Sequence, residues 1–300
     1  MPTRDTDWAV RQYESIRHLL PKAEMPQTSR HLANLGDLAD MFDVFLLDAF
    51  GVLNVGNASI ADAPERVKLL QDMGKRVLVL TNGATFPAQK SLEKFTSLGF
   101  EFALNDIVSS RDALTQALRD MPQTGIWGAM AAAGSQLDTL ETPCLHLETN
   151  QAAFDAVCGF LLLSTTDWGE DQQTLLQESL KANPRPVLVG NPDIVAPREH
   201  GLTLEPGHHA YELIKQLGIH PGLFGKPFGN IYDLALSRLP EVDPSRVLMV
   251  GDTLHTDVLG GAARGFRTAL VTNHGLFSGC DVVPHIRRTG IVPDYVVPTI

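Results

Sequence analysis

Short runs of apolar residues alternate with amphipathic stretches along most of this 300-residue chain. The runs at 42–47, 76–80 and 246–250 are strand-sized and rich in apolar residues, which is typical of strands buried on both faces of a sheet. Between the first two runs, apolar residues at helical spacing in the segment 61–73 predict a connecting helix. This alternation predicts a parallel sheet whose strands are joined by right-handed helical crossovers.

The same two patterns extend over most of the remaining chain. They predict helices at 8–20, 32–41, 87–98, 172–182, 208–217, 229–238 and 256–263. They predict further strands at 107–109, 159–164, 186–189, near Leu223 and at 266–271.

The rhythm of strands and helices is interrupted in the middle of the chain. Residues 123–150 are rich in Gly, Ala and Thr and carry no strong pattern, and the earlier rhythm returns at about residue 207. The simplest account is one α/β domain interrupted by a second, inserted α/β domain. We therefore predict an N-terminal helical extension at 1–41, a core domain formed by 42–121 and 207–300, and an inserted domain at 122–206.

Composition narrows the class of protein. The chain is 44% hydrophobic and 20% charged, as expected of a globular protein. Its net charge of −11 argues against a nucleic-acid or anionic-membrane partner, because no basic stripe exists to neutralise a polymer of phosphates. The three widely spaced cysteines provide neither a disulfide framework nor zinc spacing. With no secretion signal and no run long enough to span a bilayer, we expect a cytoplasmic protein and leave a homodimer open.

Polar groups that could work together follow four of the predicted strands. In an open parallel sheet, functional residues lie beyond the carboxyl ends of the strands. The four segments are Asp48 with the residues up to Val52, Thr81-Asn82, Gly225-Lys226-Pro227, and Gly251 to Asp257 with its acidic residues Asp252 and Asp257. Each alone is more often a helix cap or a turn. A carboxylate, a hydroxyl, a lysine and an acidic pair at strand ends of one sheet are, together, the parts needed for phosphoryl transfer.

These four segments resemble, in order and spacing, the four motifs of the haloacid dehalogenase superfamily. The insertion lies between the second and third motifs, as in the class IIA branch with its NagD-type sugar and nucleotide phosphatases. The stretch from Gly190 to Asp193 also looks like that branch. The resemblance covers 42–300 and implies a Rossmann-like parallel sheet with helices on both faces, plus an inserted α/β cap domain. It also implies a small phosphorylated substrate.

The resemblance implies a role for each matched residue. Asp48 matches the nucleophile that forms an aspartyl-phosphate, which splits one difficult displacement into two. Thr81 and the backbone N–H of Asn82 match the donors that hold the phosphoryl oxygens. Lys226 matches the cation that offsets the charge of carboxylate and phosphate brought together.

A Mg²⁺ site is implied as well. Asp252, the Asp48 carboxylate and the main-chain carbonyl of Phe50 match its ligands, and Mg²⁺ favours such an oxygen-only shell. Asp257 matches the acid that orients Lys226 or a metal-bound water. Asn191 and Asp193 are candidates for selecting the substrate from the insertion, and His255 could reach the site as a base.

Phe50 departs from the pattern of the phosphatases. They carry a second Asp at this position, which protonates the leaving group and then activates water, and a phenyl ring can do neither. Three functions therefore stay open: a phosphatase slowed or specialised by Phe50, a ligand-binding or regulatory protein with weakened catalysis, and a carbon–halogen hydrolase. The acidic segment with Asp252 and Asp257 favours phosphoryl chemistry, because dehalogenation requires no divalent ion.

Overall fold

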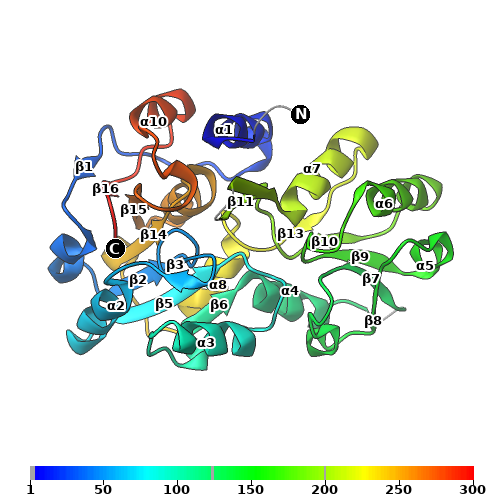
Figure 1. The fold of residues 1–300 in the computed structure, drawn as a ribbon, viewed down its shortest axis with the longest axis horizontal. Helices are drawn as coiled ribbons and strands as arrows, with labels where there is room; N and C mark the ends of the chain where they lie inside the picture. Colours follow the sequence, from blue (N-terminus) through cyan, green and yellow to red (C-terminus); the bar gives the residue numbers. More distant parts are fainter. Residues whose placement is uncertain (1–3, 123–124, 199–200) are drawn as a thin grey trace.

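A parallel seven-stranded sheet forms the larger of two lobes (Figure 1). The computed structural model describes residues 4–122, 125–198 and 201–300. The strands lie in the order β1 (Arg30–His31), β16 (Tyr295–Val297), β15 (Arg267–Val271), β14 (Val247–Gly251), β2 (Val44–Leu47), β5 (Arg76–Thr81) and β6 (Ile107–Ser109). The α/β fold class is thereby confirmed.

Helices cover both faces of this sheet, which is why its strands are apolar on both sides. In β2, Phe45 and Leu47 pack with α2 (Ala63–Asp72) and α3 (Ala88–Ser97), whereas Val44 and Leu46 pack with α8 (Gly229–Ser237). The helices α9 (Leu259–Ala263), preceded by a π-helical turn at Leu254–Val258, and α10 (Val283–Thr289) complete the lobe.

The smaller lobe contains a second parallel sheet. Its strands lie in the order β13 (Gly222–Leu223), β10 (Val187–Val189), β9 (Gly159–Leu162), β7 (Trp127–Met130) and β8 (Cys144–His146). One face packs on α5 (Gln151–Ala156), α6 (Glu170–Ala182) and α7 (Pro206–Leu217). The other face packs on α4 (Ser110–Arg119), which follows β6 and so joins the two lobes.

Two boundaries differ from those expected from the sequence. We expected the inserted segment to end at 206, but α7 packs on the smaller sheet and β13 pairs with β10. The smaller lobe therefore continues to Leu223, because both elements bury their apolar residues there. The segment 1–41 is not only helical, since β1 forms the edge strand of the large sheet beside β16.

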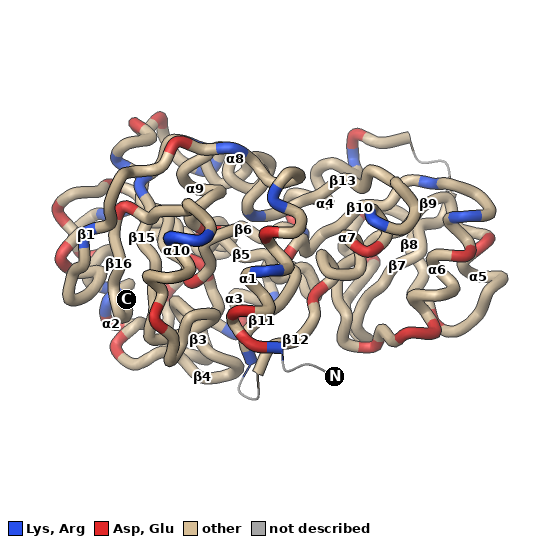
Figure 2. Tube along the Cα trace, turned by 90° about the horizontal axis from the view of Figure 1, so that it is seen from above, with Lys and Arg blue, Asp and Glu red and all other residues tan. Residues whose placement is uncertain are grey.

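The N-terminal helix α1 (Thr6–Ser15) lies where the two lobes meet. Its buried residues Ala9, Val10 and Tyr13 belong to one apolar cluster with Leu259 of the large lobe and Tyr211 of α7. Seen from above, α1 runs beside the hairpin of β11 (Val195–Arg198) and β12 (Gly201–Leu204) (Figure 2). The helix therefore contacts both lobes and the hairpin between them.

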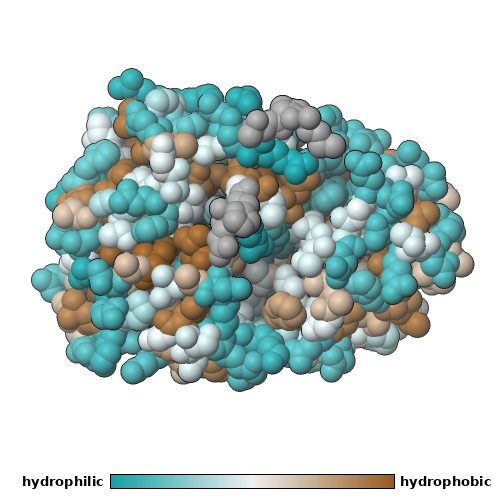
Figure 3. All heavy atoms as spheres, in the orientation of Figure 1, coloured by the Kyte–Doolittle hydropathy of each residue, from teal (hydrophilic) through white to brown (hydrophobic). Residues whose placement is uncertain are grey.

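The surface is mixed in character. Apolar and polar side chains are interspersed over both lobes on the face shown in Figure 3. A small hairpin of β3 (Asn54–Val55) and β4 (Ala58–Ser59) follows β2 beside the large sheet. Among the described residues, no helix combines the length and the apolar character needed to cross a membrane.

Candidate active site

Three of the predicted strand ends meet at one edge of the large sheet. Asp48 directly follows β2, Asp252 directly follows β14, and Thr81 is the last residue of β5. These strands are neighbours in the order β14, β2, β5, so their carboxyl ends lie side by side. The sheet thus brings together residues that are separated by about two hundred positions in the chain.

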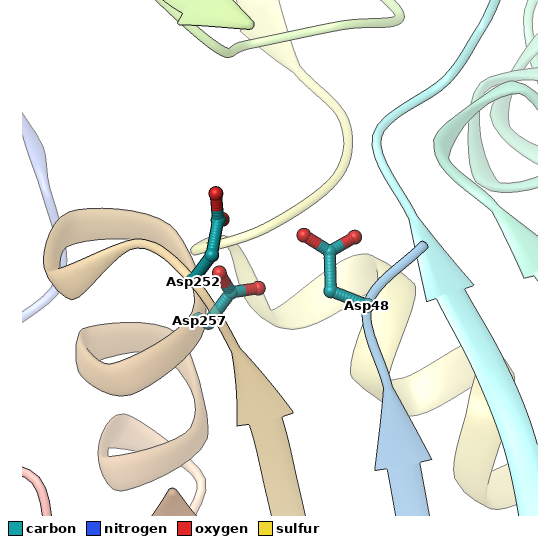
Figure 4. Close-up of side chains that lie close together, drawn as sticks. All are labelled: Asp48, Asp252 and Asp257. Carbon is teal, nitrogen blue, oxygen red and sulfur yellow. The ribbon is translucent and has the colours of Figure 1, made fainter. Parts of the chain in front are cut away.

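Three carboxylates form the centre of this edge (Figure 4). Ligand oxygens of Asp48, Asp252 and Asp257 all lie within 4.8 Å of one another. Asp252 accepts hydrogen bonds from the Thr253 hydroxyl at 2.8 Å and from the backbone N–H of Leu276 at 2.7 Å. Burial raises the pKa of Asp252 well above its usual value, and the two neighbouring carboxylates raise it further. The cluster therefore carries more negative charge than a buried site tolerates without cations.

Lys226 supplies one cation to this cluster. Its Nζ lies 2.6 Å from Oδ1 of Asp48 and 2.7 Å from Oδ1 of Asp257, and the side chain is only 2% exposed. Burial alone would lower the pKa of Lys226, but Asp257 and Asp48 outweigh burial and raise it. Burial raises the pKa of Asp48 to about 6 although Lys226 acts in the opposite direction. One lysine thus only partly compensates the three carboxylates.

Asn82 holds Lys226 in place. The Lys226 N–H donates to Oδ1 of Asn82 at 2.7 Å, and Nδ2 of Asn82 donates to the Lys226 carbonyl at 2.8 Å. Gly225 has a φ of +115°, and a Cβ there would collide with the Asn82 side chain, so only glycine allows this approach. The sequence predicted Lys226 beyond a strand of the same sheet as Asp48. This was wrong, because β13 pairs within the smaller sheet.

Asp193 also reaches the site. Its carboxylate accepts a hydrogen bond from Nδ2 of Asn82 at 2.8 Å. Burial raises the pKa of Asp193 to about 8, which Lys226 and the Asn82 amide only partly oppose. The hydroxyl oxygen of Thr81 accepts a hydrogen bond from the N–H of Gly83 at 3.1 Å, which leaves its proton available for another acceptor.

Asn191 is engaged within the protein. Its Oδ1 accepts from the N–H of Asp193 at 3.0 Å, and its Nδ2 donates to Oε2 of Glu205 at 3.1 Å. Glu205 in turn binds Arg198 of β11 with an N–O distance of 3.2 Å. Asn191 therefore shapes the turn that carries Asp193 and links it to the hairpin.

Phe50 lies half-buried near this centre with two cations over its ring. Nζ of Lys94, from α3, is 4.6 Å from the ring centroid. The guanidinium carbon of Arg198 is 4.9 Å from the same centroid. Phe50 therefore occupies a basic environment that sequence reasoning did not foresee, since Lys94 and Arg198 lie in segments with no recognisable motif.

Tyr13 is another residue that sequence reasoning missed, and it lines the cavity of the site, whereas His255 does not. The two rings stack with centroids 5.0 Å apart, and Nε2 of His255 lies 2.7 Å from a Glu14 carboxylate oxygen. His255 is bound in this arrangement and does not line the cavity over the site, so the expectation that it reaches the site is wrong. The Tyr13 hydroxyl accepts the N–H of Ile194 at 3.1 Å. No signal distinguished Tyr13 from the other apolar positions of its helix.

A cavity of about 720 Å³ opens over these groups. Its lining includes residues from both lobes, from the hairpin and from α1. The predicted site residues that line it are Asp48, Phe50, Thr81, Asn82, Asn191, Asp193, Lys226 and Asp252. The cavity is of the size that binds small molecules.

Two family models match the chain. Residues 45–138 match haloacid dehalogenase-like hydrolases, and residues 223–300 match a second, HAD-hydrolase-like model. The first segment contains Asp48 and Thr81, and the second contains Lys226, Asp252 and Asp257. The chain belongs to the haloacid dehalogenase superfamily. Both matching models describe hydrolases, and the insertion between the second and third motifs is that of the class IIA branch.

Several relatives of this chain are named as phosphatases. It is 28% identical over 293 residues to a glycerol-3-phosphate phosphatase of Gallus gallus, covering 86% of this chain and 89% of the relative. It is 25% identical over 262 residues to an acid sugar phosphatase of Staphylococcus aureus, covering 85% and 93%. A crystal structure from Cytophaga hutchinsonii, described as a possible sugar phosphatase of the superfamily, has a TM-score of 0.80 at 24% identity, covering 90% of this chain and 98% of that one.

The residues at the sheet edge fit a divalent metal ion. Asp48, Asp252 and Asp257 offer only hard carboxylate oxygens within 4.8 Å of one another, which is the donor type that Mg²⁺ prefers. A divalent ion would also neutralise the charge that Lys226 leaves uncompensated. Members of the superfamily that act as phosphatases generally use such an ion.

Proposed function

We propose that this protein is a Mg²⁺-dependent phosphatase that hydrolyses a small phosphorylated metabolite through an aspartyl-phosphate on Asp48. The observation that carries the proposal is the contact of Asp48 with the buried Lys226, opposite the carboxylates of Asp252 and Asp257. A nucleophilic carboxylate that must approach an anionic phosphate needs a fixed cation beside it, because the two anions otherwise repel each other in a water-poor site.

The reaction proceeds in two displacements. A carboxylate oxygen of Asp48 attacks phosphorus, and the bond from phosphorus to the leaving-group oxygen breaks with its electron pair on that oxygen, which then takes up a proton. Water next attacks the aspartyl-phosphate, loses a proton and releases inorganic phosphate, which regenerates Asp48. The hydroxyl of Thr81 and the backbone N–H of Asn82 donate hydrogen bonds to the phosphoryl oxygens during both steps.

The remaining residues position these groups. Lys226 offsets the developing charge, and Asp257 holds its ammonium toward Asp48. Asp48, Asp252 and the carbonyl of Phe50 would hold Mg²⁺, which supplies electrostatic stabilisation of the phosphoryl group when bound. Asp193, which faces the cavity on its Asn191-supported turn, contributes to substrate selection.

Phosphate release from a panel of phosphorylated metabolites tests this function. Wild-type protein should release inorganic phosphate with Mg²⁺ and not with a chelator, and Asp48→Asn should abolish the release. Acid quenching followed by intact-mass measurement should detect a phosphorylated fraction that is absent in Asp48→Asn. The exposed residue Asp171 offers a matched control, and Asp171→Asn should retain both signals. No release and no phosphorylated fraction with any substrate would refute the function.

Phe50 favours one alternative, a ligand-binding or regulatory protein with weakened catalysis. In that case the cavity should bind a phosphorylated compound measurably without turning it over. A carbon–halogen hydrolase is a weaker alternative, because that chemistry gives the three-carboxylate cluster no role. A haloacid in the same panel, with chloride release as the readout, separates this third function from the other two.

A further inference from the structure

Two cations face the cavity beside Phe50. Nζ of Lys94 and the guanidinium of Arg198 both lie within 5 Å of the ring centroid, and all three residues line the cavity that contains Asp48. They come from separate parts of the chain, since Lys94 lies on α3 of the large lobe and Arg198 ends β11. Phe50 stands two residues after Asp48, the nucleophile of the proposed function.

The charge of Lys94 is poorly compensated. Within the parts of the chain that the structure describes, no carboxylate lies within ion-pair distance of its ammonium, whereas Arg198 binds Glu205. Burial lowers the pKa of Lys94, and the neighbouring Arg198 lowers it further. The Phe50 ring attracts a cation only weakly compared with an anion at contact distance. Lys94 and Arg198 both bring positive charge to the lining of one cavity, next to the Phe50 ring, and such a lining favours an anion.

We propose that Lys94 and Arg198 bind a second anionic group of the substrate, beside the phosphoryl group that Asp48 attacks. The substrate is then a phosphorylated carboxylic acid or a bisphosphate rather than a neutral sugar phosphate. This inference rests on the proposed phosphatase function, since it assigns the substrate class of that same cavity. It also gives the ring of Phe50 a role, because the ring holds the two cations toward the leaving group.

Pairs of substrates that differ only in the second charge test the inference. For the carboxylate we would compare 2-phosphoglycolate with 2-phosphoglycolamide, and for the phosphate the bisphosphate of ethylene glycol with 2-hydroxyethyl phosphate. The kcat/KM of wild-type protein should be higher for the charged member of one pair by roughly tenfold or more, the size expected of a charge-assisted hydrogen bond. The pair that shows the preference identifies the anion.

Variants then assign the preference to Lys94. Lys94→Met should lower the kcat/KM of the charged member several-fold more than that of the neutral member, and Lys94→Arg should restore the difference. Lys90→Met is the matched control, because Lys90 lies on the same helix but is exposed and paired with Glu93. Lys94 is a cleaner target than Arg198, since removing Arg198 would leave the buried Glu205 without its cation.

The outcomes separate this inference from the proposed function. Equal kcat/KM values within both pairs would overturn the inference and leave the phosphatase function intact. An equal loss for charged and neutral members in Lys94→Met would mean that Lys94 only holds α3 against the hairpin, and would overturn it too. If no compound is hydrolysed, calorimetric binding of the same pairs to Asp48→Asn with Mg²⁺ decides. Tighter binding of a charged member that Lys94→Met abolishes supports the anion site, and equal binding refutes it.

Discussion

Phe50 is the residue that departs from the phosphatase pattern to which the sequence was compared, in which a second Asp is expected at this position. Its ring lines the cavity and lies close to Lys94 and Arg198. A positioned general acid contributes roughly 10²–10⁴-fold when an alkoxide must be protonated as it leaves. A leaving group that is already a stable anion needs no such proton.

We therefore predict a steep dependence of the first step on leaving-group pKa, with aryl or acyl phosphates preferred over sugar phosphates. Phe50→Asp should raise the turnover of alkyl phosphates, because it restores a carboxyl beside the leaving group. Stopped-time assays over a series of alkyl and aryl phosphates measure both effects. Phe50→Leu, which also removes the ring but adds no carboxyl, is the control and should not raise alkyl turnover.

Equal rates for alkyl and aryl phosphates in the wild-type protein would contradict this prediction. Another residue would then supply the proton, and the structure changes which residue is tested first. His255 is bound to Glu14 away from the cavity, whereas Asp193 lines it and has a pKa raised to about 8 by burial. Asp193→Asn would be the variant that abolishes the alkyl activity.

The sequence predicted the candidate catalytic residues better than the residues that hold them in place. Asp48, Thr81 and Asp252 were recognisable because each ends a strand whose burial on both faces leaves an unmistakable apolar run. The two hydrogen bonds between Asn82 and Lys226 could not be predicted, because Asn82 follows a strand of the large sheet and Lys226 follows a strand of the smaller one. Tyr13 and Lys94 lie on ordinary amphipathic helices, and a helix shows which face is apolar but not which distant cavity one side chain reaches.

At the scale of helices and strands, the sequence predicted some elements and missed others. Most helices and strands around the site in the large lobe were predicted to within a few residues, but β1, β16 and α10 of that lobe were not predicted at all. In the smaller lobe, β7 and β8 went unrecognised, because residues 127–132 are mostly small and β8 is a half-buried strand of three residues, so neither carries much hydrophobic signal. The assignment of β13 and α7 to the larger sheet was wrong for a related reason. Local periodicity reveals an element but not its partner.

The helix α1 is the element whose role the structure newly defines. The Tyr13 hydroxyl accepts the N–H of Ile194, which directly precedes β11 of the hairpin. Tyr13→Phe should leave that buried N–H without a partner, at a cost of about 1–3 kcal/mol in the free energy of unfolding. It should also speed hydrogen exchange in the peptide that contains Ile194, because the hairpin loses its attachment to α1.

Tyr211→Phe is the matched control for this measurement. Tyr211 is buried in the same apolar cluster, but its hydroxyl makes no hydrogen bond to any described residue. Loss of the Tyr211 hydroxyl should lower the free energy of unfolding less than Tyr13→Phe does. It should also leave hydrogen exchange at Ile194 unaltered. If both variants exchange alike at Ile194, the hairpin is held by apolar packing alone and α1 does not anchor it through the hydroxyl.

At the scale of the whole molecule, the cavity lies between two lobes that are built as separate sheets. An aspartyl-phosphate must be shielded from uncontrolled hydrolysis, and closure of a lid over such a site is a common means of excluding water. The smaller lobe reaches the cavity through Asn191 and Asp193, and the hairpin that follows them reaches it through Arg198. These contacts place groups from both lobes around one substrate.

We therefore predict that the inserted lobe, from about residue 122 to Leu223, closes toward the large sheet when the phosphoryl site is filled. With Mg²⁺ and beryllofluoride as the phosphate mimic, X-ray scattering should give a smaller radius of gyration than with Mg²⁺ alone. Asp48→Asn is the control, because beryllofluoride needs the aspartate carboxylate and should leave that variant unchanged.

The apolar cluster around α1 contacts both lobes, so the helix either moves with the inserted lobe or limits how far that lobe closes. Tyr13→Phe distinguishes these cases, since a larger change on closure than in the wild type would mean that α1 limits it. Identical profiles with and without the mimic in the wild type would show that the two lobes are fixed relative to each other.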